Sequence, residues 1–187
     1  DTILVGLVAP ALKALQAQHP HLRYDLRVSN ELASLTRRDA DIAVRATHRP
    51  PQHLVGKRIG SIRVGLYAGR ASGITYADVE AGRTPWLAVD DAIPDHPSVG
   101  WRKRHFPKVM PTYFVNSLLI AAEMVGMGVG VGILPLLMAQ ERRDLVPLRD
   151  LQDANQSELW LLTHPESRHL RRIAVVYGHL AQTLRLP

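Results

Sequence analysis

The chain has 187 residues, enough for one ordinary domain or for two small units that share one chain. It has no cysteine, so disulfides, thiolate zinc sites and cysteine nucleophiles are excluded, and a reducing compartment such as the cytoplasm is expected. The net charge is +6, but the richest basic clusters, residues 102–105 and 168–172, are short and lack interleaved aromatic residues. Such runs are usually solvated helix faces, so direct nucleic-acid contact is the weaker interpretation. No apolar run approaches the ~20 residues that span a bilayer, so no membrane partner is expected.

The first part of the chain alternates between strand-like and helix-like apolar patterns. Residues 2–8 predict a buried strand, residues 10–19 a helix with Pro10 at its start, and residues 22–28 a second strand. Ser29 or Asn30 can cap a short helix, after which residues 42–45 predict a third strand. This β-α-β-α-β order favours a mainly parallel sheet with right-handed crossovers. Because the chain opens within a predicted strand, we expect it to be a piece of a longer protein.

Two strand-like runs, residues 54–59 and 62–68, come next, and residues 69–73 look like a linker. A second alternation of strands and helices follows. Its predicted strands are residues 86–89, 112–115, 131–134, 144–148 and 157–163. The predicted helices are residues 76–81, 99–105, 118–125, a short one opened by Pro135, and 168–185. The last of these carries an apolar stripe at helical spacing.

The stretch GMGVGVGILP, residues 126–135, has glycine at every second position from Gly126 to Gly132. A dinucleotide-binding fingerprint needs a strand, then G-x-G-x-x-G, then a helix, whereas here a helix precedes the glycines and a strand-like run follows. The third glycine position of the motif is Val131, and a Walker-type lysine is missing. We therefore expect no nucleotide cofactor. Gly126 is predicted to end the helix at position C′, and the following glycines to let a strand approach neighbouring backbone or a ligand.

The longer stretch VNSLLIAAEMVGMGVGVGILP resembles a signature of the effector-binding domain of LysR-type transcriptional regulators. Four other stretches agree with that family in order and spacing: PALKALQAQHPHLRYDL, SNELASLTRRDADIAVR, PPQHLVGKRIGSIRVGLYAG and ELWLLTHPESRHLRRIAVVYGHLAQTL. The likeness covers nearly the whole chain. In one departure, VGL runs almost directly into VAPALKAL, where the family has a loop between the first strand and the first helix. Either this loop is short or it is omitted from the chain.

The resemblance implies an α/β fold of two lobes, like the type II periplasmic binding proteins, each lobe a mixed sheet flanked by helices. It implies two chain crossovers, with residues 1–69 and 164–187 in lobe I and residues 70–163 in lobe II. A small-molecule effector is expected to bind between the lobes. The helices at Pro10 and Leu118 are expected to join copies into a homodimer or homotetramer. Operator DNA would be bound only through an N-terminal winged helix-turn-helix domain that this chain does not contain.

In open α/β sheets, ligands bind at the carboxyl ends of strands, next to helix N-termini. The free amides at such positions favour an anion, for example a carboxylate. The predicted effector-binding residues are Ser29, Asn30, Arg45, Tyr67, Ala68, Asp90, Asn116, Ser117, Gly128 and Val129. Structural roles remain open for several of them. Ser29, Asn30, Asn116 and Ser117 can be plain helix caps, Arg45 can form a salt bridge, and Asp90 can cap a turn.

No enzyme motif is complete in the sequence. The histidines include no H-E-x-x-H, and GRASG at residues 69–73 misses G-x-S-x-G by one position. We therefore expect no catalytic residues and no metal site. The leading hypothesis is the effector-binding domain of a LysR-type regulator. The alternatives are a free-standing solute-binding protein for uptake and an enzyme on the same fold, which would need an acid–base pair that the sequence does not reveal.

Overall fold

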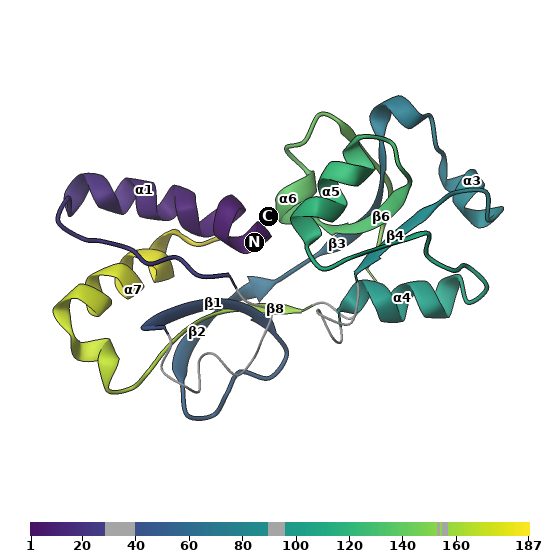
Figure 1. Ribbon diagram of the computed structural model, residues 1–187. Helices are drawn as coiled ribbons and strands as arrows, with labels where there is room; N and C mark the ends of the chain where they lie inside the picture. The colour runs from purple at the N-terminus through teal and green to yellow at the C-terminus, as the bar shows by residue number, and fades with distance from the viewer. Residues whose placement is uncertain (29–39, 90–95, 153, 155–156) are drawn as a thin grey trace. The chain divides into compact units, whose positions relative to one another are not determined.

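The computed structural model describes residues 1–28, 40–89, 96–152, 154 and 157–187 (Figure 1). The chain forms two compact units, with Asp1–Ser61 and Glu158–Pro187 in unit 1 and Ile62–Ser157 in unit 2. It passes between the units twice, in each case earlier than the family resemblance implied. Residues 64–69 form a strand of the unit 2 sheet, and residues 158–163 form a strand of the unit 1 sheet. None of the helices in the described part of the chain has the length and hydropathy that a membrane span requires.

Unit 1 begins with a helix, so the strand predicted at residues 2–8 is wrong. The π-helical turn η1 (Leu4–Val8) runs directly into α1 (Ala9–Gln18). Val8, Leu12 and Leu15 are buried at helical spacing. A short apolar run fits a buried helix as well as a buried strand, which is why periodicity did not separate them. Within the described residues, no strand precedes α1.

The second predicted strand, residues 22–28, is not a strand either. These residues have no regular secondary structure and no ladder partner among the described residues. The alternation is visible in their burial, because Leu22 and Tyr24 are half-buried whereas Arg23 and Asp25 are exposed. An alternating pattern becomes a strand only when a neighbouring strand pairs with it. The helix predicted after Ser29 lies outside the described residues.

The sheet of unit 1 contains the third predicted strand and two others. Its order is β1-β8-β2, with β1 at Ile42–Thr47, β2 at Val55–Ser61 and β8 at Glu158–Thr163. Both ladders are antiparallel. The closing helix α7 (Arg171–Thr183), preceded by the 3-10 turn η3 (Ser167–His169), packs on β8 with α1. The unit core is formed by Val8, Ala11, Leu12, Leu161, Leu180 and Leu184.

Unit 2 has a five-stranded mixed sheet, and each of its predicted strands is confirmed. Its order is β5-β4-β6-β3-β7. The strands are β3 (Val64–Gly69), β4 (Trp86–Val89), β5 (Tyr113–Val115), β6 (Val131–Pro135) and β7 (Leu145–Asp150). Strand β4 is parallel to β5 and β6, whereas β3 is antiparallel to β6 and β7. The shorter helical elements are the 3-10 turn η2 (Arg70–Ser72), α3 (Tyr76–Glu80) and α6 (Leu136–Ala139).

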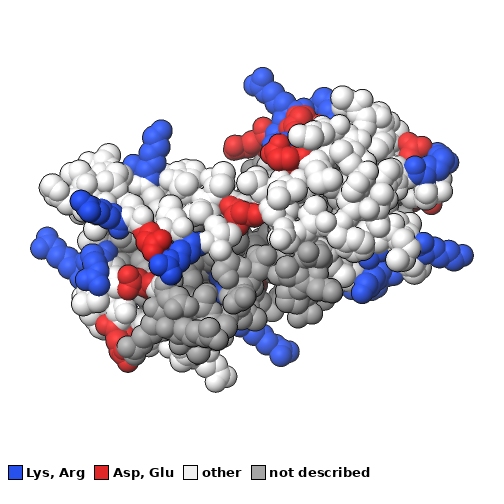
Figure 2. All heavy atoms as spheres, viewed as in Figure 1, with Lys and Arg blue, Asp and Glu red and all other residues white. Residues whose placement is uncertain are grey.

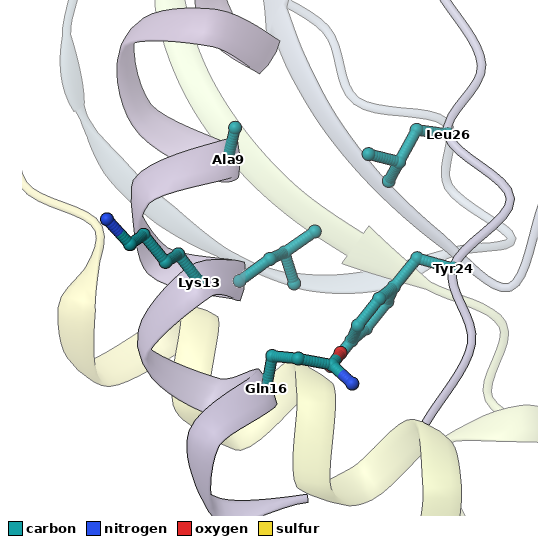
Figure 3. A pocket seen from close by; sticks show the side chains of 6 residues that line it. Ala9, Lys13, Gln16, Tyr24 and Leu26 are labelled. Atoms are coloured by element: carbon teal, nitrogen blue, oxygen red, sulfur yellow. The ribbon is translucent and has the colours of Figure 1, made fainter. Parts of the chain in front are cut away.

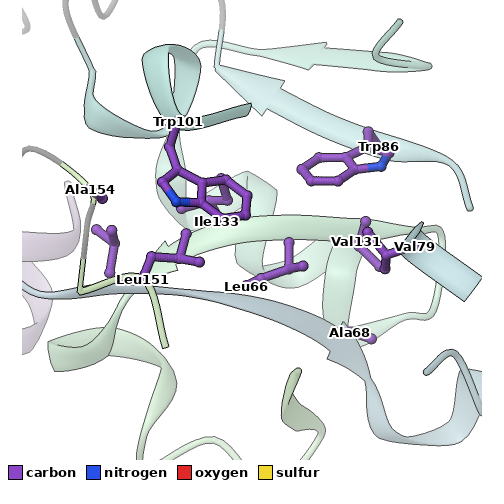
Figure 4. Packing of buried hydrophobic residues seen from close by; sticks show 10 residues of the cluster. Leu66, Ala68, Val79, Trp86, Trp101, Val131, Ile133, Leu151 and Ala154 are labelled. Atoms are coloured by element: carbon purple, nitrogen blue, oxygen red, sulfur yellow. The ribbon is translucent and has the colours of Figure 1, made fainter. Parts of the chain in front are cut away.

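Two longer helices cover opposite faces of this sheet. Helix α4 (Pro97–His105) packs Trp101 into the same core cluster as Trp86 of β4 (Figure 4). Helix α5 (Leu118–Gly126) packs Val125 into a second cluster with Leu87. Because Trp86 and Leu87 are consecutive in a strand, their side chains point to opposite faces. The two clusters are therefore the two layers of one core.

The glycine-rich stretch closes α5 and brings backbone segments together. Gly128, not Gly126, is the C′ residue, with φ at +82°. The amide of Gly128 donates to Val125 O at 2.9 Å and that of Val129 to Met124 O at 3.2 Å, which is a Schellman motif. A Cβ on Gly130 would lie 2.5 Å from Pro85 O. Gly128 thus ends α5 through its backbone conformation, and Gly130 permits close packing just before β6.

Candidate functional site

Strands β4 and β5 of unit 2 end side by side, because Val89 and Val115 are register partners in a parallel ladder. The chain leaves β4 toward α4 on one face of the sheet and leaves β5 toward α5 on the other. Neighbouring parallel strands whose next helices cover opposite faces mark a topological switch point, where open α/β sheets bind ligands. The topology of unit 2 therefore indicates a candidate ligand site at the two helix N-termini that follow Val89 and Val115.

The N-terminus of α5 is capped by Ser117, as the sequence predicted. Its Oγ accepts a hydrogen bond from the amide of Ile120 at 3.2 Å, and its carbonyl accepts from Ala121 N at 3.0 Å. The amides of Leu118 and Leu119 belong to the first turn, whose N–H groups have no acceptor within the helix. Together with the helix dipole, these donors give the end of α5 a partial positive charge. Asn116 is exposed immediately before the cap.

The N-terminus of α4 is capped by His96, which the sequence reasoning missed. Nδ1 of His96 accepts the amide of Ser98 at 3.3 Å and lies 2.6 Å from its hydroxyl oxygen. An Nδ1 that accepts the amide carries no proton, so the proton of the neutral ring is on Nε2. Burial lowers the pKa of His96 to about 4, which keeps the ring neutral at pH 7. The available signal was the His96-Pro97 pair, since proline suits the first helical position.

Four other predicted residues of unit 2 lie away from this place. Tyr67 and Ala68 belong to β3 and are packed in the core, 5% and 0% exposed, and burial raises the pKa of Tyr67. Gly128 and Val129 precede the amino end of β6, which is parallel to β4, so they lie at the opposite edge of the sheet from Val89. Their amides are already bonded to carbonyls of α5. The topology therefore groups Asn116 and Ser117 with His96 but leaves these four residues out.

Arg45 lies in β1 of unit 1, opposite Trp160 in the β1–β8 ladder. Burial lowers the pKa of its half-buried guanidinium. Ser29, Asn30 and Asp90 lie outside the described residues. The described part of the chain contains no group of three or more histidine or acidic side chains placed to hold a metal ion.

The surface charge shows no single basic face in the view of Figure 2. Lysine and arginine side chains project from separate places there, with acidic side chains among them. Six ion pairs of the described residues include Arg142 with both Glu123 and Asp144, and Arg83 with Asp78. The Arg142 guanidinium lowers the pKa of Asp144 through a hydrogen bond. The hydrogen-bond donors of unit 2 that suit an anion are the amides of the first turn of α5. At the N-terminus of α4, Pro97 has no amide proton, and the amides of Ser98 and Val99 donate to His96.

Comparisons with known proteins agree with this α/β architecture. A family model described as the LysR substrate binding domain matches residues 1–185. An HTH-type transcriptional regulator of Xanthomonas campestris pv. campestris is 34% identical over 61 residues, which is 33% of this chain and 18% of that regulator's length. The matched stretch is thus a small part of a longer regulator.

Solved structures of LysR-type regulators have the same fold. The regulatory domain of CrgA from Neisseria meningitidis superposes with a TM-score of 0.78 at 18% identity, covering 97% of this chain and 93% of that one. The effector domain of AmpR from Pseudomonas aeruginosa gives a TM-score of 0.76 at 16% identity, covering 98% and 91%. Both likenesses extend over nearly the full length of each chain. With the family model matching almost every residue, the chain belongs to the LysR substrate binding domain family.

Proposed function

We propose that this chain is the ligand-sensing domain of a cytoplasmic LysR-type DNA-binding transcriptional regulator, and that its effector is a small anion. The observation that carries the proposal is the topological switch point of unit 2. There β4 and β5 end side by side at Val89 and Val115, and the chain continues into α4 and α5. Asn116 and Ser117 are the effector-binding residues that we place there, with His96 shaping the same edge. Ser29, Asn30, Arg45 and Asp90 remain predicted effector contacts.

The effector would act through differential affinity for two arrangements of the whole regulator. DNA would be bound by a winged helix-turn-helix domain elsewhere in that protein, so effector binding changes transcription without touching DNA. The Xanthomonas campestris relative and the two solved structures are transcriptional regulators, which favours this role over that of a free-standing uptake protein.

Assembly into a homodimer or homotetramer is part of the proposal, through the outward faces of α1 and α5. Ile120 of α5 is 49% exposed, and Val5 of η1, the turn that runs into α1, is 58% exposed. We expect Ile120→Glu to shift sedimentation velocity toward the monomer without lowering the melting temperature, because an exposed side chain contributes little to the core. Sedimentation that is identical in the wild-type chain and the variant would contradict this assignment.

A thermal-shift screen against small carboxylates, amino acids, phenolics and sugars tests the effector proposal. An anion at a hundred times its Kd adds about 2.7 kcal/mol, which is a rise of roughly 5–10 °C for a chain of this size. The double variant Asn116→Ala with Ser117→Ala should abolish the rise. Thr75→Ala is the matched control, because Thr75 caps α3 of the same unit. Saturable binding of uncharged ligands alone, unaffected by the double variant, would overturn the proposal.

A further inference from the structure

Apolar side chains reach the surface of the two units in different electrostatic surroundings. In unit 1 a hollow between α1 and residues 22–28 is lined mainly by apolar side chains, with Lys13 as the one charged residue of its lining (Figure 3). In unit 2, Met110 and Phe114 are 80% and 61% exposed and follow the basic C-terminal end of α4 in the chain. The surface of unit 2 therefore combines exposed apolar area with several positive charges.

Positive charge gathers at the end of α4 because no acidic residue interrupts this part of the sequence. Residues 96–122 contain no aspartate or glutamate, and Arg102, Lys103, Arg104 and Lys108 lie close together within them. The ion pairs of the described residues include none of these four cations. The dipole of α4 favours cations in its last turn, but Lys108 lies beyond the helix. Lys103, Arg104 and Lys108 are exposed, so their charge is available to a partner.

Arg102 holds the segment that follows α4 against the helix. Its Nη1 donates a hydrogen bond to the carbonyl oxygen of Val109 at 2.7 Å. Phe106 and Val109 pack against the core cluster that contains Trp101 of α4. Met110 follows Val109 directly in the chain. The backbone of Met110 is therefore fixed beside the basic last turn of α4, with its side chain exposed.

Phe114 lies on the face of the sheet that α4 covers. It is the register partner of Ala88 in the parallel β4–β5 ladder. Ala88 points to the same face as Trp86, two residues before it, and Trp86 packs into the core cluster under α4. Met110, Phe114 and the end of α4 therefore contribute to one surface of unit 2. Exposed apolar area of this kind marks a place where a partner binds.

We propose that the surface formed by Lys103, Arg104, Lys108, Met110 and Phe114 binds an acidic polypeptide segment that carries apolar side chains. Carboxylates of the segment pair with the three cations, and its apolar side chains cover Met110 and Phe114. Methionine, arginine and aromatic residues are enriched where proteins contact one another. A phosphate backbone would use the cations but leave both apolar side chains exposed. Helices that bind a lipid surface have an apolar outer face, whereas the exposed residues of α4 are all basic.

The probe is a synthetic peptide made of equal numbers of glutamates and leucines, and its binding to the chain is measured by isothermal titration calorimetry. We expect saturable binding that weakens as the salt concentration rises, because salt screens exposed charges. One comparison peptide has glutamine in place of every glutamate, and another has serine in place of every leucine. Each should bind at least about tenfold more weakly, because each lacks either the charges or the apolar area that the surface matches.

Substitutions at the surface locate the contact. Lys103→Glu should weaken peptide binding at least about tenfold, because a like charge then faces the glutamates. Lys13→Glu is its matched control, since Lys13 is an exposed lysine of α1 in unit 1. Met110→Ser combined with Phe114→Ser should weaken binding about tenfold through lost apolar contact. Met127→Ser is the control for this pair, because Met127 is 78% exposed and lies outside the proposed surface.

The proposal is independent of the effector site, because Asn116 and Ser117 take no part in it. The double variant Asn116→Ala with Ser117→Ala should therefore bind the peptide as the wild-type chain does. Absence of saturable peptide binding, equal binding of the glutamine peptide, or equal losses in the variants and their controls would each overturn the proposal. A DNA duplex or a phosphatidylserine vesicle that displaces the peptide and binds more tightly would also overturn it, by assigning the surface to phosphate groups.

Discussion

Gly128 and Gly130 have different roles although they are two residues apart. Gly128 has φ at +82°, and a Cβ there would only touch Ser72 at 3.4 Å, so the backbone conformation is what requires glycine. At Gly130 a Cβ would lie 2.5 Å from the carbonyl oxygen of Pro85, so space is the constraint. The sequence predicted close approach in this stretch, but only coordinates separate a conformational requirement from a steric one.

We expect Gly130→Ala to lower the free energy of unfolding by about 2 kcal/mol, because backbone must move to admit the methyl group. Gly178→Ala is the matched control. Gly178 lies in the middle of α7, and beyond its chain neighbours and the helix's own backbone no atom lies within 4 Å of the position that a methyl group would take there. Alanine should therefore stabilise by about 1 kcal/mol. Urea unfolding of both variants measures the difference. A neutral Gly130→Ala would contradict the close approach to Pro85.

His96 predicts a pH dependence of stability. Its pKa is about 4 in the folded chain, below the ordinary value of 6.5, so the unfolded chain binds more protons between these two values. The contribution of His96 is therefore fully present above about pH 6.5 and is lost as the pH falls toward about 4. Replacement by asparagine, another capping residue, should flatten the dependence of the urea midpoint on pH across this window. An unchanged slope would show that His96 is not held neutral.

At the scale of elements, the local sequence pattern predicted most helices and strands of unit 2 correctly. In unit 1, two strands that the pattern predicted do not form. Residues 86–89 and 131–134 are short apolar runs next to proline or glycine, namely Pro85, Gly130 and Pro135, and the strands predicted there are confirmed. Residues 2–8 were equally apolar but are helical, and residues 22–28 alternate but have no partner among the described residues. Pairing is a tertiary property, so no local pattern reports it.

The cap of α5 can be separated from the proposed anion site by two substitutions of Ser117. Ser117→Ala should cost about 1 kcal/mol of stability, because the amide of Ile120 loses its acceptor. Ser117→Asp should retain that stability, since aspartate also caps helices, yet weaken binding of an anionic effector at least about tenfold by charge repulsion. Urea unfolding and calorimetry measure the two effects. Equal effector affinity in Ser117→Asp would place the anion elsewhere.

At the scale of the whole molecule, each unit has a core of its own. Trp101 belongs to a cluster of unit 2 and Leu161 to one of unit 1. Collinear likeness to a known family predicted the division into two units with two crossovers. It did not predict the boundaries, because the strands at residues 64–69 and 158–163 pair with sheets on the other side of the expected division. The N-termini of α4 and α5 lie at one edge of the sheet because of the strand order, which the sequence did not predict. For this reason the sequence did not point to His96.

Separate cores predict separate local stability. Trp101→Ala leaves a large cavity costing about 3–5 kcal/mol, and we expect it to speed amide hydrogen exchange in unit 2. Leu161→Ala should do the same in unit 1. Exchange measured by mass spectrometry distinguishes the two patterns. If either variant speeds exchange equally in both units, the chain unfolds as one cooperative body and this division has no energetic meaning.

The most direct test of the effector assignment is an amide NMR titration of the chain with the best carboxylate from the thermal-shift screen. We predict saturable shifts at Ser98, Leu118 and Leu119, in the first turns of α4 and α5, with smaller changes at the opposite edge near Gly128. Saturable shifts confined to the Gly128 edge, or to unit 1, would contradict the assignment of the anion to the switch point between β4 and β5.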